Sequence, residues 1–360
     1  MSAPKDMFFE SEVRPEQNGR LLLDSLSERF TYHSREEWSE KISRGLVTIN
    51  GNPATLETLG HRGDKVIYHV ENYSEPDVPT HYETLFEDEE FLLVAKPAGV
   101  PVHHTGRIFY NTFTAIIRRG FDCETATPMH RLDRDTGGIM LFAKSVDTTS
   151  RFQKHLDRIL LRKFYLAVVP GEFPEGEVRC DLPLSENPSA PIRIKMYHTP
   201  GGKPCSTVFR RLAVLPGAAA KSASSETAVK NSCRSLVECE LLTGRKHQIR
   251  AHLAELGFPI VGDRLYSFDG KFYQKMSGGG ALSEEDFDLL GAHHQMLYAY
   301  KVQLQLPYWD EPRVFTDFHF PEDMAAALKS VDFTTAGSLP LEPYSLRSPR
   351  RIGSIRLLPK

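Results

Sequence analysis

Residues 130–138 read HRLDRDTGG, and this is the most informative stretch of the chain. It places one carboxylate, Asp133, between Arg131 and Arg134, just before two glycines that favour a bend. A nearby positive charge lowers the pKa of a carboxyl group because it favours the ionised form. Asp133 is therefore expected to stay ionised, which makes it a candidate nucleophile or base.

A second stretch, residues 243–253, reads TGRKHQIRAHL and groups cationic and hydrogen-bonding side chains without an acidic residue. Its composition fits a turn that runs into a helix. Together the two stretches predict a carboxylate that works inside a cationic, anion-binding cleft.

The bulk composition is that of an ordinary globular protein and favours two domains. The 360 residues exceed the length at which one hydrophobic core usually stops growing. The net charge of −3 excludes a protein coated in positive charge, so nucleic-acid binding would have to come from a local patch. Residues 131–163 offer such a patch, with eight Lys or Arg against four Asp.

The cysteines and the apolar runs indicate a reducing compartment. The five cysteines are odd in number and show no C-x-x-C spacing, so neither a disulfide framework nor a zinc site is expected. No uncharged apolar stretch approaches the roughly 18 residues that a membrane span requires. We therefore expect a cytoplasmic protein that contacts no membrane and binds no metal.

Changes in composition divide the chain into five segments. We predict a flexible N-terminus over 1–19, a small α/β unit over 20–72, a linker over 73–81, a large domain over 82–330 and a basic, disordered tail over 331–360.

The small unit should contain two helices followed by a hairpin. Apolar residues recur at helical spacing over 22–30, and Ser34 with Glu37 forms a capping box that opens a second helix. Asn50-Gly51 predicts a tight hairpin turn.

In the large domain, short apolar runs predict strands at 92–95, 139–143 and 163–169. Apolar residues over 152–160 predict a helix that leads into the third strand. The low-complexity segment 216–231 is expected to form an exposed, flexible insertion between two strands.

Four motifs make residues 20–328 resemble a pseudouridine synthase of the RluA type. Residues 130–138 resemble the family's catalytic H-R-L-D-x-x-T-S-G motif, and residues 163–167, KFYLA, resemble its K-x-Y-x-A strand. Residues 243–250 resemble its T-G-R-T-H-Q-I-R segment, and residues 96–102 resemble its K-P-x-G-x-x-V loop. The resemblance implies an α+β fold, with a mixed, largely antiparallel central sheet flanked by helices.

The third motif continues to Gly262-Asp263, and the sequence departs from the family pattern at three positions. Gly137 stands where Ser is usual, Lys246 where Thr is usual and Tyr298 where His is common. None of these exchanges removes a charged catalytic group.

The small unit resembles the RNA-binding module of the ribosomal-protein S-four type. Ser34-Arg35, Asn50-Gly51 and Gly63-Asp64 carry this resemblance. It implies phosphate contacts from cations of the second helix, of which there are three candidates: Arg35, Lys41 and Arg44. Glutamates are interleaved with these cations, so a merely solvated helix is the alternative.

The resemblance also implies roles for individual residues. Asp133 would carry out the central step, by covalent attack or by removing a sugar proton, and Arg250 would pair with it. Tyr165 would face the uracil, although an ordinary core tyrosine is the alternative. Arg131 would fill the stack that a flipped-out uridine vacates, or else contact phosphate. The residues expected to bind substrate are His130, Arg131, Thr136, Lys163, Arg245, His247 and Gln248.

The predicted function is the isomerisation of specific uridines to pseudouridine in tRNA or large-subunit rRNA, a reaction that needs no cofactor. RNA is the expected partner, no obligate protein partner is indicated, and a monomer is the default. One alternative is a catalytically silent RNA-binding or ribosome-assembly factor that keeps the fold. Another is an unrelated hydrolase with an aspartate nucleophile, for which the sequence lacks metal-ligand motifs.

Overall fold

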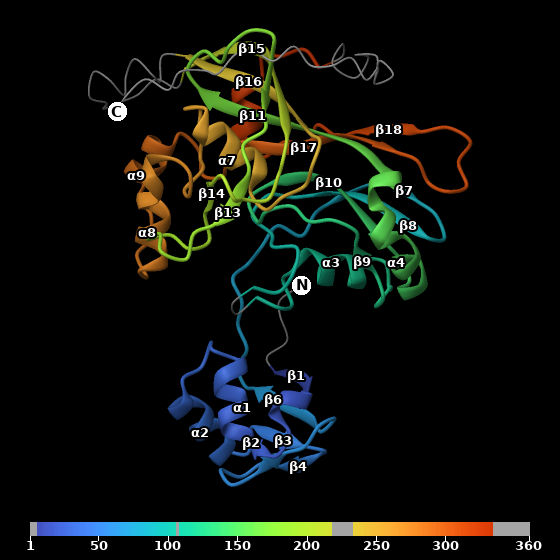
Figure 1. The fold of residues 1–360 in the computed structure, drawn as a ribbon, viewed down its shortest axis with the longest axis vertical. Coiled ribbons are helices and arrows are strands. Elements are labelled where there is room, and N and C mark those ends of the chain that lie inside the picture. The colour runs from blue at the N-terminus through green and yellow to red at the C-terminus, as the bar shows by residue number, and fades with distance from the viewer. Residues whose placement is uncertain (1–5, 106–107, 218–232, 334–360) are drawn as a thin grey trace.

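The computed structural model describes residues 6–105, 108–217 and 233–333, which form two units (Figure 1). The connector between them, residues 71–82, contains no helix or strand and includes the predicted linker. Most of the predicted insertion, from residue 218 onwards, lies outside the described residues, as does the predicted tail beyond residue 333.

The N-terminal unit is a four-stranded antiparallel sheet on which two helices pack. The strand order is β1-β6-β3-β4, and β2 pairs with β5 beside it. Trp38 is fully buried and joins the helices to the sheet within one apolar cluster. The predicted capping box is present, since Ser34 and Glu37 each accept the other's backbone N–H. The elements are β1 (Met7–Glu12), β2 (Arg20–Leu21), α1 (Leu22–Arg29), α2 (Arg35–Ser43), β3 (Val47–Ile49), β4 (Asn52–Pro53), β5 (Leu59–Gly60) and β6 (Lys65–Val70).

The predicted flexible N-terminus over 1–19 is wrong for residues 7–19. The strand β1 pairs with β6 along its whole length, from Met7 opposite Val70 to Glu12 opposite Lys65. Val13 follows it and is buried in the core of the unit. The free edge of β6 supplies the hydrogen-bond partners that order this segment, and a partner so distant in the sequence leaves no local signal.

The large unit is built on a ten-stranded mixed sheet, which confirms the predicted fold class. The strand order is β12-β15-β16-β11-β17-β10-β8-β7, with β18 beside β17 and β9 beside β10. Among the described strands of this sheet, only β10 and β17 are parallel to each other. The strands are β7 (Glu83–Glu87), β8 (Phe91–Lys96), β9 (Thr127–Pro128), β10 (Gly137–Ala143), β11 (Leu160–Pro170), β12 (Glu177–Cys180), β15 (Thr207–Pro216), β16 (Cys233–Leu241), β17 (Leu297–Leu304) and β18 (Arg313–Thr316).

Helices flank both faces of this sheet, as predicted (Figure 1). Side chains along β8 alternate between two buried clusters, because neighbouring residues of a strand point to opposite faces. Leu92 and Val94 join a cluster that includes α3 and α7, whereas Phe91 and Leu93 join one that includes α5. The helices are α3 (Phe113–Gly120), α4 (Val146–Phe152), α5 (Leu156–Ile159), α7 (Gln248–Glu255), α8 (Lys271–Ser277), α9 (Glu284–Leu290) and α10 (Glu322–Ala327), and β13 (Leu184–Glu186) with β14 (Met196–His198) forms a separate hairpin.

The helix predicted over 152–160 is divided. The helix α4 ends at Phe152, a 3-10 turn covers Gln153–His155, and α5 spans only Leu156–Ile159. Leu160 already belongs to β11, where it lies opposite Leu304. Ile159 and Leu160 enter the same buried cluster, so one apolar run serves both the end of a helix and the start of a strand.

In the part of the chain that the structure describes, no helix has the length and apolar character needed to cross a membrane.

Candidate active site

Asp133 lies on the loop that connects β9 to β10. The backbone N–H of Thr136 donates to the carbonyl of Asp133 at 3.1 Å and closes the loop into a turn. Gly138 follows with a φ of +111°, and a Cβ there would lie 2.2 Å from the carbonyl oxygen of Ala299. Only glycine fits so close to another backbone, and the loop is therefore fixed against β17.

Lys96 ties this loop to the one that follows β8. Its side chain is fully buried, and its amino group donates to the carbonyls of Pro97 and Val100 at 2.8 Å and of Arg134 at 3.0 Å. Burial lowers the pKa of Lys96 to about 7, while the charges of Asp135 and Asp133 act in the opposite direction. Three acceptors need three N–H donors, which only the ammonium form supplies.

Arg250 brings the second sequence stretch to Asp133. It lies on α7, and its Nη1 donates to Oδ2 of Asp133 at 2.7 Å. The contact joins residues 117 positions apart, and it is the pairing that the sequence predicts.

The other edge of the guanidinium is held by Asp263. The Nε and Nη2 atoms of Arg250 donate to the two carboxylate oxygens of Asp263 at 2.7 and 2.8 Å. Asp263 is fully buried and also accepts the backbone N–H groups of Leu265 and Tyr266. Arg250 is thus clamped in one orientation, with one nitrogen left to reach Asp133.

This arrangement keeps Asp133 ionised. Burial raises the pKa of its carboxyl group, whereas the charge and hydrogen bond of Arg250 and the charge of Arg131 lower it, and overall the pKa lies below its usual value. For Arg250, burial opposes the charged form, yet Asp263 and Asp133 together raise its pKa. Asp133 is therefore a carboxylate, with its side chain 22% exposed.

His247 closes the site on the α7 side. It adopts a left-handed conformation with φ of 55° just before the helix, and its Nδ1 lies 3.3 Å from the hydroxyl of Tyr266. Its Nε2 lies 3.8 Å from Oδ1 of Asp133. Burial lowers the pKa of His247 to about 4, so at neutral pH it faces Asp133 as an uncharged imidazole.

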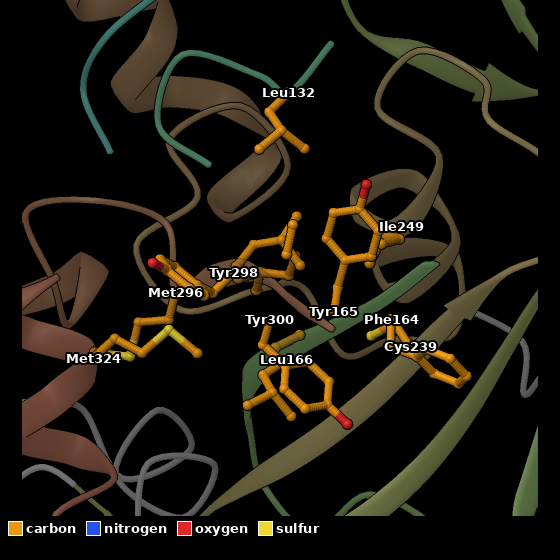
Figure 2. Packing of buried hydrophobic residues seen from close by; sticks show 14 of the residues in the cluster. Leu132, Phe164, Tyr165, Leu166, Cys239, Ile249, Met296, Tyr298, Tyr300 and Met324 are labelled. Atoms are coloured by element: carbon orange, nitrogen blue, oxygen red, sulfur yellow. The ribbon is translucent and has the colours of Figure 1, made fainter. Parts of the chain in front are cut away.

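Tyr165 stands on β11 and is almost completely buried in the apolar cluster that also contains Leu132 and Ile249. Figure 2 shows its ring beside Ile249, with the hydroxyl pointing away from the strand toward the side on which Leu132 lies. Burial raises the pKa of Tyr165, and the charge of Asp133 raises it further. The hydroxyl is therefore a neutral phenol within the electrostatic reach of Asp133.

Three residues predicted to bind substrate instead support the site from behind. Thr136 and Gln248 are each 2% exposed. The hydroxyl of Thr136 accepts from Gln295, and the amide of Gln248 bonds to Thr243, Arg245, Ser206 and Thr207. His130 accepts the backbone N–H of Leu141 at 3.1 Å, and burial lowers its pKa to about 3. We correct the prediction for Thr136 and Gln248, because their polar atoms are buried and already bonded within the protein and so do not face a ligand. His130 instead anchors the loop to β10.

Three other predicted residues carry cationic groups, and the charge of Arg131 acts on Asp133. Arg131 and Arg245 are exposed, and Lys163 is half-buried near Gly244. Arg245 donates weakly to the carbonyl of Pro204 at 3.4 Å. Neither Arg131 nor Lys163 forms an ion pair with any described residue.

The three cations predicted to bind RNA in the N-terminal unit are mostly neutralised. Arg35 bonds to Asp24 at 2.8 Å, and Arg44 lies 2.5 Å from Glu71. Lys41 forms no ion pair within the described residues. Two of the three cations are already paired with carboxylates. The structure therefore gives less support to the prediction that this helix face binds phosphate.

Comparison with known proteins agrees with the geometry. Residues 90–255 match the family model described as RNA pseudouridylate synthase. The tRNA pseudouridine(31) synthase of Saccharomyces cerevisiae is 30% identical over 274 residues, which cover 69% of this chain and 67% of that protein. This chain belongs to the RNA pseudouridylate synthase family. The pseudouridine synthase resemblance of its four motifs is thus confirmed, and the unrelated hydrolase is excluded.

Two further similarities show how much of this chain and of its relatives is shared. The mitochondrial tRNA pseudouridine(32) synthase of Saccharomyces cerevisiae is 34% identical over 273 residues, which cover 75% of this chain and 55% of that protein. The chain spans about half the length of the first curated relatives that it matches. The structure of human RNA Pseudouridylate Synthase Domain Containing 1 is 21% identical, covers 70% of this chain and 90% of that one, and has a TM-score of 0.51, which shows a shared fold. The family match begins at residue 90, so the S-four resemblance of the small unit stays a prediction.

Asp263 and Lys96 hold the candidate site together, but neither residue was assigned a role from its sequence context. Asp263 follows a glycine in the extension of the third motif, and that position was its only signal. Lys96 opens the K-P-x-G-x-x-V loop, where a lysine is ordinarily expected at the surface.

Proposed function

We propose that this chain isomerises specific uridines of structured RNA to pseudouridine, with Asp133 as the catalytic carboxylate. The observation that carries the proposal is the contact between Asp133 and Arg250, in a chain of the RNA pseudouridylate synthase family. It leaves an ionised carboxylate that is partly exposed. The cationic groups beside it are what binding of an anionic polymer such as RNA requires.

The reaction breaks the bond between N1 of uracil and C1′ of ribose, rotates the base and forms a bond from C5 to C1′. The base loses the proton at C5 and gains one at N1, so no atom is gained or lost overall. Asp133 either attacks C1′ or removes a sugar proton, and each route needs the ionised form that Arg250 maintains. The neutral phenol of Tyr165 offers an aromatic face to the base and a hydroxyl for proton transfer.

The target uridine must leave its stack to reach a carboxylate that is only partly exposed. Arg131 is exposed and forms no ion pair with a described residue, so its guanidinium is available to fill the vacated stack. Lys163 and Arg245 would contact the nucleotide or its phosphates.

We place tRNA first among the substrates, with large-subunit rRNA as the other class. Two relatives from Saccharomyces cerevisiae are named as tRNA pseudouridine synthases. One of them is named as mitochondrial, so a cytoplasmic location for this chain stays a prediction. The small unit would add RNA affinity, with Lys41 as the one of its three predicted cations that has no ion pair within the described residues. The monomeric state without an obligate protein partner is also a prediction.

The test is pseudouridine formation in unmodified tRNA and rRNA by the purified protein, detected by carbodiimide labelling. We expect modification of a few uridines by the wild type and none by Asp133→Asn, with RNA affinity unchanged within about twofold. RNA binding without modification by the wild type would support the silent RNA-binding factor instead. Undiminished activity of Asp133→Asn would remove the proposed mechanism.

A further inference from the structure

Gly137 and Tyr298 form a close steric pair directly behind the loop of Asp133. Gly137 is the first residue of β10 and lies opposite Tyr298 of β17, in the one parallel pairing of the described sheet. A Cβ on Gly137 would lie 2.7 Å from Cε2 and 3.0 Å from Cδ2 of Tyr298, and 3.2 Å from the carbonyl oxygen of Lys96. Unlike Gly138, Gly137 does not have a positive φ, so its backbone would accept any residue. The ring of Tyr298 is the nearest obstacle to a side chain here, followed by the carbonyl oxygen of Lys96.

The ring cannot easily move aside. Tyr298 is 2% exposed and lies within the buried cluster shown in Figure 2. Its hydroxyl donates to the buried carboxylate of Asp317, which also bonds Nδ1 of His319 at 2.6 Å. Phe320 packs edge-on against the ring, with centroids 5.1 Å apart. Burial raises the pKa of Tyr298, with a further contribution from Asp317, so the phenol stays a donor.

This pair lies where the Asp133 loop enters the sheet. Asp133 precedes Gly137 by four residues, and Thr136 between them accepts from Gln295, which lies just before β17.

We propose that Tyr298 is a positioning residue for Asp133, whose ring fills the space of the missing side chain at position 137 and fixes the end of the catalytic loop. The steric part stands on the structure alone, and the catalytic part rests on the proposed function.

The experiment is a double-mutant cycle read out by thermal unfolding, RNA affinity and the single-turnover rate at saturating RNA. Gly137→Ala should lower Tm by about 5 °C, since overpacking a core costs a few kcal/mol. It should slow the rate at least tenfold, with RNA affinity within twofold of the wild type. In a Tyr298→Leu background, which removes the rigid ring, Gly137→Ala should change the rate and Tm far less.

Two controls separate this contact from general damage. Tyr298→Phe keeps the ring and loses the hydroxyl, so Gly137→Ala should remain as harmful in that background as in the wild type. Gly138→Ala would meet the backbone of Ala299 at 2.2 Å, so no exchange at Tyr298 should relieve it.

The proposal is overturned if Gly137→Ala keeps the wild-type rate, or if its defect persists unchanged beside Tyr298→Leu in folded protein. Coupling in Tm without a loss of rate would also overturn the positioning role. If the wild type modifies no RNA, the proposed function fails by itself, and the Tm cycle still decides whether the steric pair exists.

Discussion

Asp263 is the residue whose replacement best tests how the site is built. Its Oδ1 accepts N–H groups from Arg250, Leu265 and Tyr266, and its Oδ2 accepts only Nε of Arg250. In Asp263→Asn the amide oxygen would take the Oδ1 position, where it keeps three bonds. The amide nitrogen would then face Nε of Arg250, donor against donor, and the buried guanidinium would lose one of its two anions.

The magnitude follows from these contacts. A hydrogen bond to a charged group is worth about 1.5–3 kcal/mol, and removing one partner of a buried ion pair costs about 3–5 kcal/mol. If about 3 kcal/mol of this interaction energy serves to hold Arg250 in line with Asp133, its loss slows the rate roughly 100-fold. We expect Asp263→Asn to slow the single-turnover release of tritium from C5-labelled uridine by this factor, with RNA affinity within about twofold of the wild type.

Glu240→Gln provides a matched control. Glu240 is 6% exposed and accepts Nε and Nη2 of Arg162 at 2.7 and 2.9 Å. It lies opposite Phe164, the neighbour of Tyr165, so its side chain points to the other face of the sheet. Glu240→Gln should lower stability but keep the rate per folded molecule. A wild-type rate in folded Asp263→Asn would refute the role given to the clamp.

Three further outcomes are expected. Arg131→Ala should slow modification of a folded RNA stem-loop at least tenfold but affect an unstructured oligonucleotide much less, because only the stacked uridine must be flipped; equal losses on both would contradict this. His247 has a folded pKa of about 4 against about 6.5 when unfolded, so the unfolded state binds more protons between these values, and stability should fall as pH drops through this window. In His247→Asn, denaturant titrations should show that decline reduced by up to about 1.4 kcal/mol per pH unit, whereas an unchanged slope would mean that His247 is not buried as described. Thr136→Val removes the acceptor of Gln295 and should lower both Tm and the rate while leaving RNA affinity unchanged, and weaker RNA binding would restore Thr136 as a ligand contact.

The sequence reveals the reactive groups of this site better than it reveals their support. Asp133 and Arg250 stand in charged motifs, and their expected contact is present at 2.7 Å. The prediction for Gln248 failed for a physical reason. A glutamine beside cationic residues looks like a ligand group, but here its amide is consumed by four neighbours that only the folded chain brings together.

The same limit explains what the sequence missed elsewhere. The buried amino group of Lys96 donates to three backbone carbonyls, one of them 38 residues away in the sequence. A periodic sequence pattern cannot predict such acceptors. The strand β1 was missed because its partner, β6, lies more than 50 residues further along the chain. Local alternation and capping signals predict an element well only when the element is stabilised by residues close to it in sequence, as α2 is by Ser34 and Glu37.

Two carboxylates share Arg250, and their geometry decides which of them can react. Asp263 is fully buried and both of its oxygens accept N–H groups, so it has no oxygen left for a substrate. Asp133 receives only one bond from the guanidinium, at Oδ2. Among the described residues the ring of His247, uncharged at neutral pH, lies 3.8 Å from its Oδ1. Asp263 therefore orients Arg250, and Oδ1 of the ionised Asp133 carboxylate is left open to a substrate. An arginine held by Asp133 alone could turn to cover both of its oxygens. Under the proposed function, Asp263 is therefore what leaves an oxygen of Asp133 available to react.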